Sequence, residues 1–94
     1  MALIVQKFGG TSVADIDRIK AAALRAKKEV DAGNQVAVVL SAMSGVTNKL
    51  VEYVSEITAL HDAREYDSVV STGEQVTTGL LALALQELGV SARS

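Results

Sequence analysis

LIVQKFGGTS, residues 3–12, joins a short apolar run to two glycines and two hydroxyl side chains. Residues 3–8 predict a short and largely buried β-strand, because the run is apolar and β-branched and glycines follow it. Lys7 places a positive charge at the exit of this strand, and Gly9 and Gly10 let the backbone come close to a ligand. Together with the N-terminal end of a following helix, these groups favour an anion, so we expect a phosphate-binding turn.

The order of residues separates this turn from two common phosphate motifs. In a Walker A loop the lysine follows the glycines, and a dinucleotide-binding turn reads G-x-G-x-x-G. Here Lys7 comes first, and Thr11 and Ser12 follow the glycines as further hydrogen-bond donors. A plain strand-to-helix turn with a solvated Lys7 explains the pattern almost equally well, so both interpretations stay open on the residues alone.

A helical period follows the turn. Residues 15–32 place a set of apolar side chains on one face: Ile16, Ile19, Ala23, Ala26 and Val30. Ser12, three residues before Asp15, is expected to cap the start of this helix, and Gly33 is expected to end it. QVAVVLS, residues 35–41, then predicts a second apolar strand, of the kind found in sheets covered on both faces.

Strand, helix and strand in this order predict a βαβ unit with two parallel strands. Both strands then end at the same carboxyl edge, where open α/β sheets bind ligands. The second exit loop is SAMSGVTN, residues 41–48, which is small and rich in hydroxyls. Four of its side chains are able to orient a small polar substrate: Ser41, Ser44, Thr47 and Asn48. Capping of a helix by Thr47 or Asn48 is the simpler alternative.

The second half of the chain is expected to be helical. One helix is predicted from Thr47 or Asn48 to about His61, and another region from Tyr66 to Leu88 with an interruption near Gly73. The first of these should bury three apolar side chains: Leu50, Val54 and Ile57. LLALAL, residues 80–85, is apolar around nearly its whole circumference and predicts burial on several sides. GVSARS, residues 89–94, predicts the start of a further strand.

Glu74, in STGEQ, is the third candidate for a functional residue. Its flanks are apolar at Val69, Val70, Val76 and Leu80. These neighbours predict that Glu74 lies near buried structure, where a carboxylate needs a partner, and the ammonium group of a ligand is one such partner. A solvated surface glutamate is the ordinary alternative.

Composition limits the classes of function. The 94 residues are 49% hydrophobic and 21% charged with a net charge of −2, which is typical of one soluble globular domain without a basic footprint for nucleic acid. The sequence has no cysteine and a single histidine, His61, to which we assign no role, so a thiolate or histidine metal site is not expected. Residues 80–85 are too few to span a bilayer, and residues 1–8 do not resemble a signal peptide. We therefore expect a cytoplasmic protein that binds neither nucleic acid nor membrane.

Three motifs in this order and spacing carry a resemblance that covers the whole chain. KFGGTS, SAMSGVTN and STGE resemble the N-terminal motifs of aspartate kinases, and KFGGTS alone points to the wider amino-acid kinase family. The resemblance implies an α/β fold, the N-terminal portion of a three-layer αβα sandwich with a parallel βαβ start. It also implies ATP-dependent phosphorylation of L-aspartate to 4-phospho-L-aspartate, the entry step to lysine, threonine and methionine synthesis, with ATP and Mg²⁺ and a homo-oligomeric parent.

The same resemblance implies roles for individual residues. Four of them resemble the nucleotide-phosphate loop: Lys7, Phe8, Gly9 and Gly10. Lys7 is also expected to be catalytic, by stabilising the transferred phosphoryl group. Ser41 and Thr47 resemble the hydroxyls that hold aspartate, and Glu74 resembles the carboxylate that receives its α-ammonium group. The aspartate side chain has an ordinary pKa of about 3.9 and is ionised at neutral pH, so the reaction needs no general base.

The kinase domain of this family continues well beyond 94 residues, with segments for the aspartate α-carboxylate, the adenine and the metal, and ACT domains normally follow. We therefore expect residues 1–94 to be the N-terminal part of such a domain and to be inactive alone. Three alternatives remain on the sequence: another amino-acid kinase acting on glutamate or a carbamate, a non-catalytic Rossmann-like nucleotide-binding module, and a structural fragment that associates through residues 80–85. A substrate screen separates the first of these from an aspartate kinase.

Overall fold

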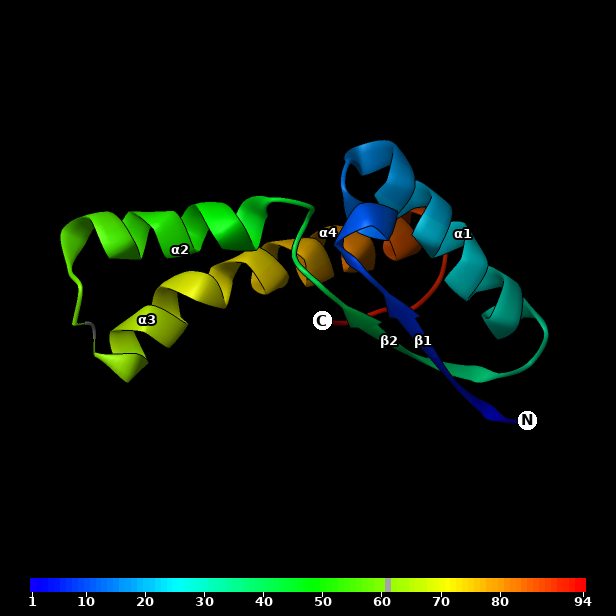
Figure 1. The fold of residues 1–94 in the computed structure, drawn as a ribbon. Coiled ribbons are helices and arrows are strands. Elements are labelled where there is room, and N and C mark those ends of the chain that lie inside the picture. The colour runs from blue at the N-terminus through cyan, green and yellow to red at the C-terminus, as the bar shows by residue number, and fades with distance from the viewer. Residues whose placement is uncertain (61) are drawn as a thin grey trace.

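A computed structural model describes residues 1–60 and 62–94. The elements are β1 (Leu3–Phe8), η1 (Gly10–Val13), α1 (Ile16–Asp31), β2 (Gln35–Leu40), α2 (Val46–Ile57), α3 (Ala63–Val70) and α4 (Thr72–Glu87). β1 and β2 pair in parallel, from Leu3 opposite Gln35 to Phe8 opposite Leu40, and α1 connects them (Figure 1). The predicted βαβ unit with parallel strands is confirmed.

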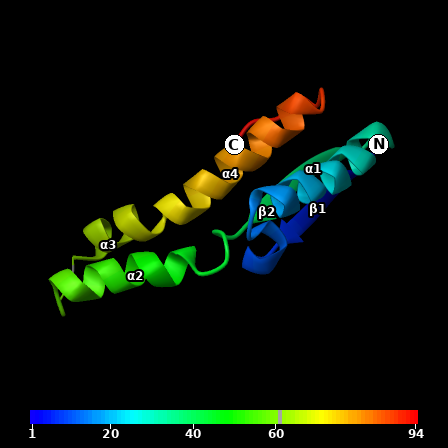
Figure 2. The same ribbon diagram turned by 90° about the horizontal axis from the view of Figure 1, so that it is seen from above.

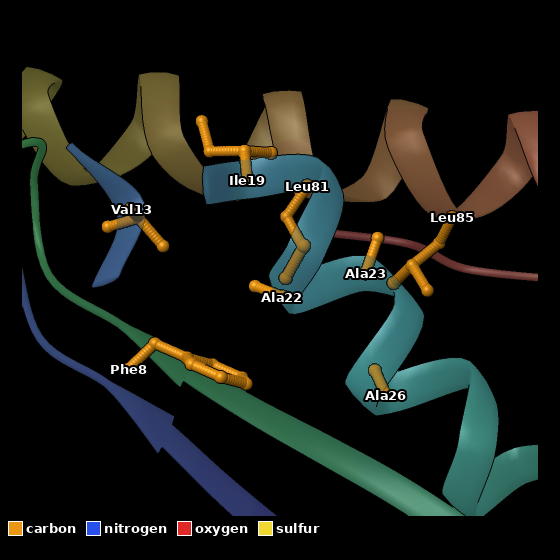
Figure 3. Close-up of a cluster of buried hydrophobic side chains, with 8 residues drawn as sticks. All are labelled: Phe8, Val13, Ile19, Ala22, Ala23, Ala26, Leu81 and Leu85. Carbon is orange, nitrogen blue, oxygen red and sulfur yellow. The ribbon is translucent and has the colours of Figure 1, made fainter. Parts of the chain in front are cut away.

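The hydrophobic core lies between one face of this sheet and the helices α1 and α4 (Figure 3). Its buried side chains come from β1, η1, α1 and α4: Phe8, Val13, Ile19, Ala22, Ala23, Ala26, Leu81 and Leu85. Alanines on α1 leave room for α4 to pack closely, and Figure 2 shows the two helices running side by side, with α1 over the strands. The described residues thus supply the sheet and one helical layer of an α/β fold.

The other face of the sheet is open in the described part of the chain. Because side chains alternate along a strand, Phe8 points to the helices while Leu3, Val5 and Lys7 point the opposite way. Leu3 is 66% exposed, Val5 64% and Val39 50%. The expectation that both faces of the strands are covered is therefore wrong for these residues.

The start of α1 differs from the prediction. Ser12 lies in the short 3-10 turn η1, and its backbone N–H donates to the carbonyl of Gly9. The cap of α1 is Asp15, whose side chain accepts from the backbone N–H of Arg18 at 2.8 Å. Ile16 is half exposed, because the buried face of the helix begins only at Ile19. Gly33 follows the helix with φ of +92°, in agreement with its predicted role as a stop.

The helices α2 and α3 extend as an arm away from the sheet, so that the molecule measures 50 × 24 × 18 Å (Figures 1 and 2). α2 ends at Ile57, which is 86% exposed and not buried as predicted, while Leu50 and Val54 are partly buried. His61, the predicted end of this helix, lies outside the described residues.

The interruption between α3 and α4 is at Ser71, because Gly73 belongs to the first turn of α4.

α4 is less completely buried than its sequence predicts. Leu81 and Leu85 face the core, whereas Leu83 is 62% exposed, since α1 and β2 cover only one side of the helix. Gly89, with φ of +82°, ends the helix, and residues 90–94 form no strand, contrary to expectation. Within the described residues, no helix combines the length and the apolar character needed to cross a membrane.

Candidate functional site

The turn after β1 and the loop after β2 leave the sheet together. The backbone N–H of Ser41 donates to the carbonyl of Phe8 at 3.2 Å and so continues the strand pairing beyond Leu40. The predicted convergence of the two exit segments at the carboxyl edge is confirmed by this pairing.

A cleft of about 270 Å³ lies at this edge. Its walls come from the turn after β1, the loop after β2 and the first turn of α4: Gly10, Ser41, Ala42, Met43, Ser44, Gly45, Thr47, Asn48 and Glu74. Hydroxyl groups, one amide and one carboxylate therefore face a common space. Such a set of groups suits a small polar ligand that carries a positive charge.

The loop leaves its polar side chains available because it does not use them to cap α2. Gly45 has φ of +84°, a left-handed conformation that favours glycine, and it occupies the N-cap position of α2 without a side-chain hydrogen bond. The backbone N–H of Val46 donates to the carbonyl of Met43 and closes the turn. Capping by Thr47 or Asn48, the simpler explanation of this sequence, is thus wrong.

Glu74 lies in the first turn of α4, and its side chain is exposed. The neighbouring Gly73 is buried, so Glu74 is next to buried structure in the chain, but its own side chain is not buried. Val69 and Val76, which motivated the prediction of buried surroundings, are exposed as well. Even so, Glu74 lines the cleft, and with Thr47 it also lines an adjoining hollow of about 200 Å³ that contains Asp67. Asp67 was not predicted, although a signal exists in the sequence: Ser71 keeps a helical backbone, with φ of −66° and ψ of −18°, so that Asp67 and Glu74, seven residues apart, fall on the same helical face.

Lys7, Phe8 and Gly9 do not line the cleft. Lys7 pairs with Val39 in the register and is exposed on the open face of the sheet. The side chain of Phe8 is buried in the core, so only its backbone is available to a ligand. Gly9 is exposed, and a Cβ there would meet no atom within 4 Å.

Gly10 has a packing role that the sequence did not indicate. A Cβ on Gly10 would lie 3.0 Å from the carbonyl oxygen of Ala42 and 3.5 Å from the backbone nitrogen of Ser44. The glycine therefore permits a close approach between two protein segments. The turn is also not the start of α1, whose first residues are capped by Asp15, so the predicted contribution of a long helix at this turn is wrong.

The hydroxyl residues of the turn face another hollow, of about 250 Å³, on the α1 side. Thr11 and Ser12 line it together with Arg18 and Arg25. The guanidinium group of Arg18 donates to the carbonyl of Thr11 and fixes the turn against α1. The two arginines were not singled out in the sequence, because at seven residues apart on a helix they read as an ordinary solvated face.

Residues 2–94 match the Amino acid kinase family. The chain belongs to this family. Curated relatives include the aspartokinase of Rickettsia felis, 57% identical over all of this chain and 24% of the relative, and the aspartate kinase of Pseudomonas putida, 56% identical over all of this chain and 23% of the relative. The chain thus spans about a quarter of the length of the curated relatives that it matches.

Solved structures of this family share the fold. The crystal structure of aspartate kinase from Synechocystis superposes with a TM-score of 0.88 at 52% identity, over 92% of this chain and 15% of that chain. E. coli aspartokinase III in complex with lysine and aspartate superposes with a TM-score of 0.70 at 25% identity, over 94% of this chain and 30% of that chain. The amino-acid kinase fold expected from the three motifs is confirmed.

Proposed function

We propose that residues 1–94 form the N-terminal part of the kinase domain of an aspartate kinase. The reaction transfers the γ-phosphoryl group of ATP to the side-chain carboxylate of L-aspartate and releases ADP and 4-phospho-L-aspartate. The observation that carries the proposal is the cleft in which Gly10, Ser41, Thr47 and Glu74 meet, because three separate motifs contribute to it. Membership of the amino acid kinase family and 57% identity to an aspartokinase support it further.

Glu74 and the loop hydroxyls suit the recognition of aspartate. Glu74 is the charged residue among the described side chains that line the cleft, and a carboxylate there attracts an α-ammonium group. The hydroxyls of Ser41 and Thr47 supply hydrogen bonds that hold the bound aspartate in place. This division leaves the ionised side-chain carboxylate of aspartate free to act as the nucleophile.

Lys7 and the turn that follows it suit the phosphate groups. In the proposed step, a carboxylate oxygen of aspartate forms a bond to the γ-phosphorus while the bond from this phosphorus to the β,γ-bridging oxygen breaks, and ADP leaves with that electron pair. The protein contributes mainly alignment and charge stabilisation to such a transfer. Lys7 supplies the positive charge, and Phe8, Gly9 and Gly10 supply backbone groups at the strand exit.

A metal ion fits this part of the chain only as a companion of the nucleotide. No group of three or more His, Cys, Asp or Glu side chains that suits a metal occurs in residues 1–60 and 62–94. Mg²⁺ in kinases is commonly held by substrate phosphates and one or two carboxylates, and it neutralises phosphate charge. We therefore propose that Mg²⁺ enters bound to ATP, and we assign none of these residues to it.

The wider setting follows from the same proposal. 4-Phospho-L-aspartate is the first intermediate of lysine, threonine and methionine synthesis, so we propose a cytoplasmic biosynthetic enzyme. We also propose that its parent is a homo-oligomer, as the resemblance to aspartate kinases implies.

A substrate comparison tests the function. The full-length protein that contains this chain is assayed for ADP release with ATP and Mg²⁺ in the presence of L-aspartate, L-glutamate or no acceptor. ADP release that depends on L-aspartate, with formation of an acyl phosphate that hydroxylamine traps, supports the proposal. A preference for glutamate, or ATP hydrolysis without any acceptor, overturns it.

A further inference from the structure

We infer that Gly73 is a positioning residue for Glu74. By lacking a side chain, Gly73 lets the first turn of α4 pack directly on Ala42, and this contact sets how far Glu74 stands from the hydroxyls of the loop at residues 41–48. The inference rests on the proposed function, because it assigns Glu74 to the capture of aspartate.

A methyl group at Gly73 does not fit without a shift of its neighbours. A Cβ built there would lie 3.0 Å from the Cβ of Ala42, 3.2 Å from Cγ1 of Val46 and 3.5 Å from Cδ1 of Leu50. Carbon atoms pack best at about 3.5–4.0 Å, so the first two contacts are too short. Gly73 does not have a positive φ. Close packing, and not an unusual backbone conformation, is therefore what requires glycine at this position.

The same requirement is absent elsewhere on α4. Glycine inside a helix is less favourable than alanine by about 1 kcal/mol. A Cβ on Gly79 would meet no atom within 4 Å, whereas Gly73 is buried. The two glycines lie on one helix, and only the first touches the loop that lines the cleft.

Ala42 connects both glycines of the site. It is buried, its Cβ faces Gly73, and its carbonyl oxygen faces Gly10 from the turn after β1. One small residue thus fixes the loop between the turn that we assign to phosphate and the helix that carries Glu74. A displacement of Gly73 from Ala42 therefore changes the width of the cleft.

The rest of α4 is held too firmly to absorb such a displacement. The hydroxyl of Thr77 is buried and donates to the carbonyl of Gly73 at 3.0 Å. One turn further along, Leu81 is anchored in the core. A methyl group at position 73 then requires a shift of a few tenths of an ångström between the loop at Ala42 and the first turn of the helix, which carries Glu74 next to the added atom.

Three variants of the full-length protein test this inference. Gly73→Ala is expected to raise the KM for aspartate about 3- to 10-fold, because misplacement of a binding group by a fraction of an ångström weakens capture. The KM for ATP and kcat should stay within about twofold, since the turn after β1 is untouched. Gly79→Ala is the matched control and should leave all three constants unchanged. Gly73→Ala combined with Ala42→Gly moves the methyl group across the contact and should return the aspartate KM to within about twofold of wild type.

The outcomes separate this inference from the proposed function. If the wild type releases no ADP with aspartate, the proposed function fails and the inference falls with it. If the wild type is active and Gly73→Ala equals Gly79→Ala, the inference alone is wrong. A lower kcat together with higher KM values for both aspartate and ATP indicates general damage to the protein and also overturns the inference. Should circular dichroism show that Gly73→Ala does not fold, recovery of the fold and of the aspartate KM in the double variant supports the inference, and failure of the double variant rejects it.

Discussion

The carbonyl of Phe8 accepts a hydrogen bond from the backbone N–H of Ser41 at 3.2 Å, and this bond ties the exit of β1 to the exit of β2. Ser41 therefore has two separable parts. Its backbone holds the two exit segments together, while its side chain lines the cleft. A substitution that keeps the backbone tests the hydroxyl alone.

Ser41→Ala is expected to raise the KM for aspartate about 2- to 12-fold in the full-length protein, because one hydrogen bond contributes about 0.5–1.5 kcal/mol. The stability of the protein should change little. Ser55→Ala is the matched control, since the hydroxyl of Ser55 donates to the carbonyl of Val51 on α2 and does not line the cleft. Steady-state kinetics of the two variants test this prediction. The same KM for aspartate in Ser41→Ala and Ser55→Ala would contradict the role of the Ser41 hydroxyl.

Glu74→Gln is expected to raise the KM for aspartate by about 10-fold or more, because a hydrogen bond to a charged partner contributes about 1.5–3 kcal/mol. The KM for ATP should not change. Asp67→Asn is an informative companion, since Asp67 lines only the adjoining hollow. If Asp67→Asn raises the KM for aspartate and Glu74→Gln does not, Asp67 and not Glu74 is the partner of the α-ammonium group.

Much of the fold was predictable because the pattern of apolar residues has a clear period. The apolar runs at residues 3–8 and 35–41 and the helical period between them determine a βαβ unit. Its parallel strands bring two exit loops to one edge, and so Ser41 and Thr47 were correctly expected near the turn after β1. The position of Glu74 in the same cleft came from a family resemblance, since nothing local indicates where α4 begins.

The errors have one physical cause. Periodicity identifies the apolar face of a helix but not whether a partner covers it, and so Ile16, Ile57 and Leu83 were expected to be buried but are exposed. A glycine is equally ambiguous. Gly73 was taken as a break in a helix, whereas it is a packing position, and the two cases differ only in a contact with Ala42 that is 31 residues away in the sequence.

Lys7→Ala is expected to lower kcat about 10²- to 10³-fold with a smaller effect on the KM for aspartate, because removal of a group that stabilises transition-state charge has effects of this size. The exposed position of Lys7 at the end of β1 leaves its side chain free to reach a nucleotide. Lys28→Ala, an exposed lysine in the last turn of α1, serves as the control. A near-normal kcat for Lys7→Ala would mean that Lys7 is a solvated lysine without a role in the reaction.

Asp15→Ala is expected to weaken the start of α1, because loss of an N-cap costs about 1 kcal/mol. The backbone N–H of Arg18 loses its acceptor at 2.8 Å, so its hydrogen exchange should accelerate. Asp17→Ala removes a charge from the same turn without removing the cap, and it should have a smaller effect. Hydrogen exchange measured by mass spectrometry on peptides from residues 12–22 distinguishes the two, and equal protection in both variants would show that Asp15 is not the cap that matters.

The 94-residue chain, expressed by itself, is expected to self-associate. Leu3, Val5 and Val39 are exposed together on the open face of a two-stranded sheet, and contiguous apolar surface of this kind favours association. Val5→Lys should shift the chain toward the monomer, because it places a charge in the centre of that face. Leu24→Lys, which changes an exposed leucine on α1, is the matched control and should have little effect. Size-exclusion chromatography with light scattering over about a tenfold range of concentration measures the mass, and a monomer throughout would mean that the open face does not drive association.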